Sequence, residues 1–387
     1  MPETWISFSQ NGTREGRYLV GIETHESRDE IFFSVPAGFF AHNDSVAAAL
    51  ATLCGKKYKS IKFNFPVSAA CSEAVRQRTG ANVSAAAKGS ERQPGHNIGL
   101  NFSGGFDSLA SYLLAPEQIR VAVAFGSWFE REREFVETLK PGIICTTDFR
   151  QKGYERNDWI FMFAVSLLFA DYLALGAVGL GTIFEATVWN YRFSRAKASI
   201  PLFDAIGLRD ATLTRGLTEF GTAQLMLHYA PELIDGSIIS LAPAKSEKRL
   251  RKRLLIDATR HRAGGPQPDF DRYEYPKDKL TYGESYPVDF LALLFLRLYG
   301  PQLVSRWMDG LDKLDLMALD QIDVGWIYRY NPLFYEDIPG ELREGVVRRM
   351  RSAAIEPFKE TDWPHYRALR DVLTKFHRFD GEGERRP

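Results

Sequence analysis

The sequence predicts an α/β protein built around a doubly wound parallel sheet. From residue 98 onward, short apolar segments alternate with helical ones, as the β–α repeats of a parallel sheet do. Residues 121–125 form a continuous apolar run, which is typical of a strand buried on both faces. The length of 387 residues is enough for two or three domains. We expect an N-terminal α/β domain at 1–92, the parallel-sheet domain at 93–262 and a helical C-terminal region at 263–387.

The first 92 residues have the pattern of a small separate unit. Residues 61–65 alternate apolar and polar side chains, which predicts a half-buried strand. Asp44 is placed to cap a helix over 45–53, and Ser68 to cap another that runs through Arg78. Further strands are expected at 5–8, 17–22 and 30–35, and the polar tract 88–95 is expected to be a linker.

The second domain is expected to alternate four strands with three helices. The longest helix covers 158–175, and Gly176 is expected to end it. In a doubly wound sheet, ligands bind beyond the carboxyl ends of the strands, so the loops after these strands should line one cleft. The expected strands are 98–102, 121–125, 143–147 and 177–182, and the other two helices are 108–114 and 130–139.

The chain becomes helical from about residue 240. Eight lysines and arginines lie between 245 and 262, and such a run is either a solvated helix face or a contact for phosphate or a macromolecule. Amphipathic or apolar helices are expected at 287–296, 341–353 and 365–376.

Composition excludes several classes of protein. Lys+Arg and Asp+Glu are equal at 49 each, which argues against a dedicated nucleic-acid coat. The three cysteines form no C-x-x-C pair, so we expect no zinc, and a reducing cytoplasm fits them. The most apolar stretch, 159–170, is shorter than the roughly 18 residues of a membrane span. We therefore expect a cytoplasmic protein without signal peptide or membrane segment.

The hexapeptide 103–108 (SGGFDS) is the most informative stretch of the chain. It follows an apolar strand and precedes a helix, a geometry that suits a phosphate chain. Gly104 and Gly105 let backbone N–H groups approach an anion, and the helix N-terminus adds unsatisfied donors. Ser103 and Ser108 offer hydroxyls, and Asp107 can hold the Mg²⁺ that accompanies phosphates. No G-K-[ST] follows, so the loop is not a Walker A motif.

The S-G-G-x-D-S pattern resembles the pyrophosphate loop of the PP-loop ATP pyrophosphatase superfamily, whose fold is of the HUP type. The resemblance implies an AMP-forming ligase that uses ATP and Mg²⁺. Such enzymes adenylate a carbonyl or carboxylate oxygen, release pyrophosphate and let ammonia or an amine displace AMP. The resemblance assigns Asp107, Ser108 and Arg215 to catalysis, with Arg215 where the family has a lysine, and Asp107 to the metal. It assigns nucleotide contacts to Ser103, Gly104, Gly105, Phe106, Asp107, Ser108, Phe125 and Gly181.

Five residues in the other loops are candidate contacts for the acceptor. Asp148 and Arg150 follow the third strand, although an aspartate there also fits a turn or a helix cap. Glu185 follows the fourth strand as a substrate contact or a solvated loop acid. Trp189 and Arg192 can stack on a heterocycle and bond its edges, but Trp189 equally suits a core position.

The order of events after the loop looks most like the 7-cyano-7-deazaguanine synthase branch. The shared features are the turn 147–150 (TDFR), Arg156-Asn157 before an apolar helix, Gly176-Ala177 and Leu180-Gly181. This chain departs from that branch in lacking its four zinc cysteines and in having an added N-terminal unit. Relatives with extra N-terminal regions occur in bacterial anti-phage operons, so a role in antiviral defence is an expectation by resemblance.

Other functions remain open at this point. A nucleotide-binding sensor or scaffold would bind ATP without turnover, and a tRNA-modifying PP-loop enzyme would want a catalytic cysteine pair. The acceptor is either a small molecule or a macromolecule with a carbonyl or carboxylate. No amidotransferase nucleophile motif is evident, so a separate protein is expected to supply ammonia, and a homodimer is compatible with the sequence.

Overall fold

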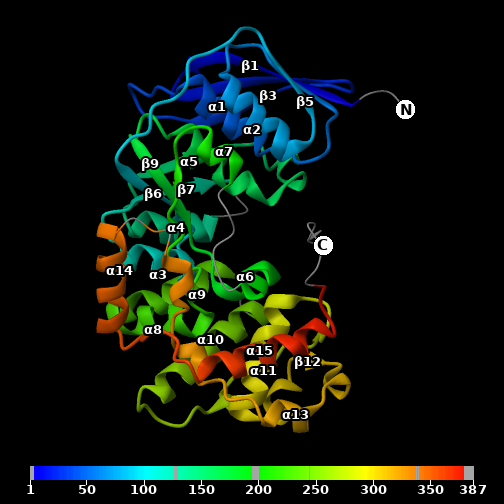
Figure 1. The fold of residues 1–387 in the computed structure, drawn as a ribbon, viewed down its shortest axis with the longest axis vertical. Coiled ribbons are helices and arrows are strands. Elements are labelled where there is room, and N and C mark those ends of the chain that lie inside the picture. Colours follow the sequence, from blue (N-terminus) through cyan, green and yellow to red (C-terminus); the bar gives the residue numbers. More distant parts are fainter. Residues whose placement is uncertain are drawn as a thin grey trace. The chain divides into compact units, whose positions relative to one another are not determined.

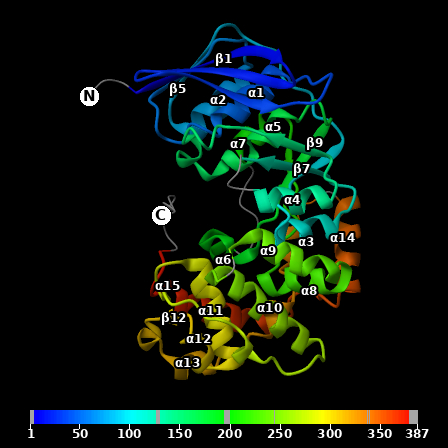
Figure 2. The same ribbon diagram turned by 180° about the vertical axis from the view of Figure 1, so that it is seen from behind.

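The computed structural model describes residues 4–125, 130–193, 200–243, 245–336, 338 and 340–378. The chain is an α/β protein, as predicted, and its ribbon is drawn in Figures 1 and 2. The chain divides into two compact units, each assembled from segments far apart in the sequence. The first contains 1–104, 116–180 and 198–212, and the second contains 105–115, 181–197 and 213–387. The predicted domain boundaries at 92 and 262 stay a prediction, because compact units do not show which segments fold independently.

The first unit begins with a mixed five-stranded sheet in the order β3-β2-β1-β4-β5. Strand β1 pairs antiparallel with β2 and parallel with β4. Phe8 and Val20 are fully buried, whereas their neighbours Ser9 and Leu19 are only half-buried, so one face of the sheet supplies the core. The strands are β1 (Trp5–Arg14), β2 (Arg17–Thr24), β3 (Arg28–Ser34), β4 (Ser60–Phe63) and β5 (Asn82–Ala85).

The second sheet of this unit is parallel throughout, in the order β10-β9-β6-β7-β8. The chain starts at the central strand, adds two strands on one side and then two on the other. This order is compatible with a doubly wound sheet, and it reverses between β6 and β9. The strands are β6 (Asn97–Asn101), β7 (Ile119–Ala124), β8 (Ile143–Thr146), β9 (Leu175–Leu180) and β10 (Arg209–Asp210).

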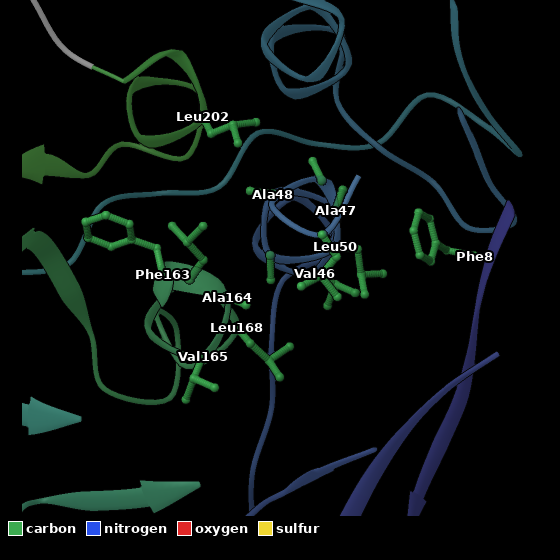
Figure 3. Close-up of a cluster of buried hydrophobic side chains, with 14 of the residues drawn as sticks. Phe8, Val46, Ala47, Ala48, Leu50, Phe163, Ala164, Val165, Leu168 and Leu202 are labelled. Atoms are coloured by element: carbon green, nitrogen blue, oxygen red, sulfur yellow. The ribbon is translucent and has the colours of Figure 1, made fainter. Parts of the chain in front are cut away.

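An alanine-rich helix, α1 (Asn43–Ala51), joins the two sheets of the first unit into one core. Eight of its nine residues are buried, because it is covered on several sides. Figure 3 shows α1 between Phe8 of β1 and the side chains of α5 (Ala164–Leu168). The small side chains of α1 let the two helices approach closely. The other helices of the unit are α2 (Ala69–Thr79), α4 (Glu130–Thr138), α7 (Pro201–Asp204), η2 (Tyr154–Arg156) and η3 (Trp159–Phe163).

The predicted long helix over 158–175 is wrong. The segment forms the short helices η3 and α5, and β9 already begins at Leu175. Gly176 therefore lies inside a strand instead of ending a helix. A Cβ at this position would lie 2.2 Å from the carbonyl oxygen of Gly95, so the glycine permits a close backbone approach.

The predicted cap at Asp44 is also wrong, whereas the cap at Ser68 is confirmed. The N-cap of α1 is His42, whose Nδ1 accepts a hydrogen bond from the Asp44 amide. Oδ1 of Asp44 instead accepts the amide of Ser68 at 2.8 Å and so links the starts of α1 and α2. The Ser68 hydroxyl in turn accepts the amide of Cys71 at 3.1 Å.

The second unit is mostly helical. Helix α3 packs against α8 and α14, and α8 packs against α10. Among the described residues its only sheet is the two-stranded parallel pair β11 (Leu280–Thr281) and β12 (Met308–Asp309). The helices are α3 (Phe106–Leu114), α6 (Val188–Phe193), α8 (Glu219–Tyr229), α9 (Ile234–Leu241), α10 (Glu247–Arg262), α11 (Tyr286–Tyr299), α12 (Pro301–Val304), α13 (Leu316–Asp320), α14 (Gly340–Ser352) and α15 (Asp362–Thr374). Shorter helical turns are η4 (Phe184–Ala186), η5 (Pro231–Leu233), η6 (Phe270–Arg272), η7 (Leu311–Lys313), η8 (Gly325–Tyr328) and η9 (Pro332–Tyr335).

Helix α14 fastens the C-terminal ends of two helices that matter for the site. Nε of Arg349 donates to the carbonyl oxygen of Leu113 in the last turn of α3. The same guanidinium lies 4.2 Å from the ring centre of Tyr229, the last residue of α8. A cation at a helix C-terminus is favourable for the helix dipole. Arg349 thus fixes the C-terminal ends of α3 and α8, the two helices whose N-terminal ends contribute to the candidate site.

Candidate functional site

The site is built on the N-terminus of α3. Gly105 is the N-cap of this nine-residue helix, in an extended conformation with φ −71° and ψ 161°. Because glycine has no side chain, it cannot cap the first N–H groups of the helix as Ser or Asp would. The Ser108 hydroxyl donates to the carbonyl oxygen of Gly105 at 2.9 Å, which fixes the first turn. Helix N-termini of this kind favour anions through their N–H groups and dipole.

Gly181 packs directly against the backbone of that first turn. A Cβ at position 181 would lie 2.2 Å from the amide nitrogen of Ser108 and 2.6 Å from the carbonyl carbon of Asp107. Only glycine fits without a shift of one backbone or the other. The predicted nucleotide residues Gly105, Phe106, Asp107, Ser108 and Gly181 are therefore brought together in the second unit.

Asp107 faces a lysine and a threonine that the sequence did not single out. The Thr222 hydroxyl donates to Oδ1 of Asp107 at 3.1 Å, and Nζ of Lys252 lies 3.9 Å from the same oxygen. Nζ of Lys252 also lies 3.2 Å from Oε1 of Glu219 and 5.4 Å from the ring centre of Phe106. The Asp107 side chain keeps 27 % of its surface exposed, so a ligand can reach it.

Lys252 is almost completely buried, with 6 % of its surface exposed. Its ammonium is within ion-pair distance of two carboxylates, 3.2 Å from that of Glu219 and 3.9 Å from that of Asp107, and these contacts use only part of its donor capacity. Oε2 of Glu219 has no partner within the described ranges. Buried polar atoms are nearly always hydrogen-bonded, so unsatisfied ones beside a helix N-terminus indicate a functional site.

Glu185 belongs to the same cluster. Its Oε1 accepts the backbone N–H of Glu219, the first residue of α8, at 2.7 Å. Its side chain is 1 % exposed, and Oε2 has no partner among the residues described. Of the two alternatives for Glu185, the solvated loop acid is excluded because the residue is buried, and the substrate contact stays a prediction. Glu185 holds the start of α8 against the loop that contains Gly181.

Burial and neighbouring charges set the protonation of these groups. Burial, reinforced by the charge of Glu219, raises the pKa of Glu185 well above its ordinary value. Burial also raises the pKa of Asp107, with Lys252 opposing the shift. Burial alone would raise the pKa of Glu219, but Lys252 and Arg251 outweigh it and lower that pKa. Burial alone would lower the pKa of Lys252, and its two carboxylates outweigh it and raise that pKa. These shifts favour the ionised forms of Glu219 and Lys252 and the neutral form of Glu185.

The turn that contains Arg215 borders the same loop. The Thr214 hydroxyl donates to the carbonyl oxygen of Thr182 at 2.7 Å, and the amide of Phe184 donates to Leu217 at 2.8 Å. Arg215 is half-buried in this turn. Arg215 thus belongs to the turn that these two hydrogen bonds attach to the loop. Among the described residues, the cation within ion-pair distance of Asp107 is Lys252.

The remaining predicted nucleotide residues belong to the first unit. Ser103 is exposed, and Gly104 has a φ of +73°, a conformation that favours glycine. Phe125 follows β7, and its ring meets those of Phe149 and Phe161 at 5.3 and 6.3 Å between centres. Each of these three predicted residues thus follows the carboxyl end of a strand of the parallel sheet.

The two predicted acceptor contacts after β8 are engaged within the first unit. Oδ1 of Asp148 accepts the amide of Phe32 in β3 at 2.9 Å, and Oδ2 lies 3.2 Å from Nζ of Lys152. The Arg150 guanidinium lies 5.5 Å from the ring centre of Phe125. Asp148 therefore ties its loop to the N-terminal sheet, a contact that the sequence did not predict.

The side chains of Trp189 and Arg192, both in α6, lie outside the described part of the structure. Lys252 is one of the eight basic residues in 245–262, and its sequence neighbours distinguish it from the rest of that run. Leu255, Ile256 and Thr259 follow it at helical spacings of three, four and seven, and all are buried. A lysine on the apolar face of a helix needs a buried counter-ion.

Three further features concern metal ligands, cysteines and membrane segments. Within the described ranges, no group of three or more His, Cys, Asp or Glu has a geometry suited to a metal ion. All three cysteines are buried and unbridged, and burial raises the pKa of Cys145 to about 12. In the part of the chain that is described, no helix combines the length and the apolar character needed to cross a membrane.

Comparison of the chain with models of protein families, with curated proteins and with solved structures finds no match.

Proposed function

We propose that this chain is an ATP-dependent, AMP-forming enzyme of the PP-loop type. It binds ATP and Mg²⁺, adenylates a carbonyl or carboxylate oxygen of an acceptor, releases pyrophosphate and lets ammonia or an amine displace AMP. The doubly wound sheet, with the predicted loop at the end of its central strand, supports this proposal.

The observation that carries the proposal is the N-terminus of α3. It combines a glycine N-cap, a second glycine pressed against the first turn, and a reachable Asp107 beside the buried Lys252. A polyphosphate is the ligand class that uses all of these groups together. Backbone N–H groups donate hydrogen bonds to its oxygens, the helix dipole and Lys252 offset its charge, and Asp107 binds the accompanying cation.

Asp107 fits a magnesium site that is completed by the ligand. The described residues offer one reachable carboxylate here, which agrees with Mg²⁺ bound by one or two carboxylates plus substrate phosphates. The ion would supply charge neutralisation for the departing pyrophosphate. The chain's own part is to hold the phosphates by the N–H groups of α3 and to position Asp107 through the Thr222 hydroxyl.

The acceptor chemistry is proposed by resemblance. The order of sequence features after the loop supports a divergent 7-cyano-7-deazaguanine synthase-like branch without zinc, and the added N-terminal unit supports a role in bacterial anti-phage defence. A separate protein would supply ammonia. Buried, unbridged cysteines fit a cytoplasmic location. The raised pKa of Cys145 disfavours sulfur transfer to tRNA, which requires a thiolate.

The decisive experiment is a pyrophosphate-release assay with Mg-ATP and a small-molecule extract as the source of acceptor. Asp107→Asn should abolish release while the protein keeps its melting temperature, and Asp235→Asn, on the exposed surface of α9, should leave release unchanged. Mass spectrometry of the mixture should show an adenylated intermediate. ATP binding by calorimetry without any pyrophosphate release would instead identify a sensor, and full release by Asp107→Asn would reject the proposal.

A further inference from the structure

Lys252 has an anionic partner within the protein itself. Its ammonium lies closer to Oε1 of Glu219, at 3.2 Å, than to Oδ1 of Asp107, at 3.9 Å. Glu219 is the first residue of α8, and its amide is held by Glu185 at 2.7 Å, so its backbone cannot easily retreat. A phosphate at the N-terminus of α3 would have to share Lys252 with this carboxylate.

The geometry of the pair suggests competition more than permanent structure. Nζ of Lys252 lies 3.2 Å from Oε1 of Glu219, but Oε2 of Glu219 has no partner within the part of the chain described. A structural ion pair of this burial normally satisfies both groups with good geometry. An ammonium whose carboxylate partner is left with one oxygen unsatisfied is instead available to a ligand that offers better directed bonds.

We propose that Glu219 is an internal competitor for Lys252 and makes the site select metal-bound polyphosphate over the bare anion. This inference rests on the proposed function, because it concerns the same phosphate site. When a bare anion draws Lys252 away, the carboxylates of Glu219 and Asp107 lose their counter-ion in a buried setting, which is costly. A ligand that brings a divalent cation to Asp107 replaces the lost positive charge. Glu219 is thus a positioning residue that acts through Lys252.

The test is calorimetric titration of the full chain with inorganic pyrophosphate, with and without Mg²⁺. Glu219→Gln removes the competing charge at nearly constant shape. It should strengthen binding of pyrophosphate without Mg²⁺ by about tenfold, the scale of one charge pair, and should shrink the advantage of the Mg²⁺ form. Glu232→Gln, at an exposed position before α9, is the matched control and should change neither value.

A second substitution separates competition from plain repulsion. Lys252→Met should weaken pyrophosphate binding at least tenfold, and in that background Glu219→Gln should have no strengthening effect. Equal strengthening in both backgrounds would mean that Glu219 repels the anion directly, and would overturn the inference. Weaker binding by Glu219→Gln would show a purely structural role and overturn it as well.

Two controls keep the result decisive. If Glu219→Gln does not fold, Glu219→Asp withdraws the carboxylate by one methylene and should strengthen binding in the same direction. Pyrophosphate release from ATP is measured on the same samples. If Glu219→Gln binds pyrophosphate more tightly but the wild type releases none from ATP, the proposed function alone is rejected. If the wild type releases pyrophosphate but Glu219→Gln binds it equally or more weakly, the inference alone is rejected. Absence of pyrophosphate binding in both proteins would reject the inference.

Discussion

Gly181 and Ser108 touch through their backbones. A Cβ at position 181 would lie 2.2 Å from the amide nitrogen of Ser108, well inside any real contact distance. The loop after β9 and the first turn of α3 therefore fit together only because residue 181 is glycine. The contact shapes the helix N-terminus at which an anion is expected, so its disruption should be visible both in stability and in binding.

Gly181→Ala should destabilise the protein by more than about 2 kcal/mol, because the added methyl forces two backbones apart. Pyrophosphate binding should fall with it. Gly345→Ala is the matched control, since a Cβ at this position in α14 meets nothing within 4 Å. Alanine is the better helix former, so this control should gain about 0.5–1 kcal/mol. Urea unfolding measures both, and equal effects of the two substitutions would contradict the packing argument.

Much of the parallel sheet could be predicted because its strands are continuous apolar runs. The strand predicted at 121–125 appears as Ile119–Ala124, and the one at 143–147 as Ile143–Thr146. The predicted helix over 158–175 is too long, because the apolar run 159–170 does not itself show where the helical turns end. The chain turns after α5 and enters β9 at Leu175, which only the packing against β6 decides.

The candidate site was predictable where backbone conformation limits the residue type. Two glycines and an aspartate between a strand and a helix point to the N-terminus of α3. The partners of Asp107 come from α8 and α10, more than 100 positions later, and no local pattern connects them. Thr222 and Glu219 carry no sequence signal, whereas the apolar neighbours of Lys252 on α10 would have shown it to be buried.

Arg92 is a further residue whose role emerges only from tertiary structure. It lies in the predicted linker but is buried, and Nε bonds Oδ1 of Asp171 at 2.9 Å. Its other nitrogens donate to the carbonyl oxygens of Ile206, Ala170 and Leu175 at 2.6, 2.9 and 2.8 Å. Arg92→Met should lower the free energy of unfolding by about 3–5 kcal/mol, because it leaves the half-buried carboxylate of Asp171 and three carbonyl groups without their donor.

Arg92→Lys should recover only part of this loss, since an ammonium cannot reproduce the planar set of donors. Arg76→Met removes a surface arginine that is also paired with a carboxylate, that of Glu73, and should have little effect. Chemical denaturation of the three variants provides the comparison. Similar small losses at both positions would show that the buried contacts of Arg92 add nothing.

Tyr191 and Tyr366 are joined by reciprocal hydrogen bonds. The Tyr191 hydroxyl donates to the carbonyl oxygen of residue 366 at 2.6 Å, and the Tyr366 hydroxyl donates to that of residue 191 at 2.8 Å. Each Tyr→Phe substitution should lower the free energy of unfolding by about 1–2 kcal/mol, because it leaves a buried carbonyl oxygen without this donor. Half-buried Tyr299→Phe serves as the control. Thermal unfolding tests the pair, and a neutral effect of both substitutions would contradict the assignment.

Glu185 should make stability depend on pH. Burial, followed by the charge of Glu219, raises the folded-state pKa of Glu185 well above the ordinary value of 4.5. The folded protein therefore holds this proton at pH values where the unfolded chain has lost it. Between 4.5 and the raised pKa, the unfolded state binds fewer protons, so this residue lowers the free energy of unfolding as pH rises.

Glu185→Gln keeps a neutral side chain of the same shape at every pH and should remove this dependence. Near pH 4 the variant and the wild type should differ little. Above that, the variant should become relatively more stable, by up to about 1.4 kcal/mol for each pH unit within the window. Urea unfolding of both proteins at several pH values gives the difference directly. A difference that stays constant with pH would mean that Glu185 is ionised in the folded protein, and its carboxylate would then need a cation that the described residues do not supply.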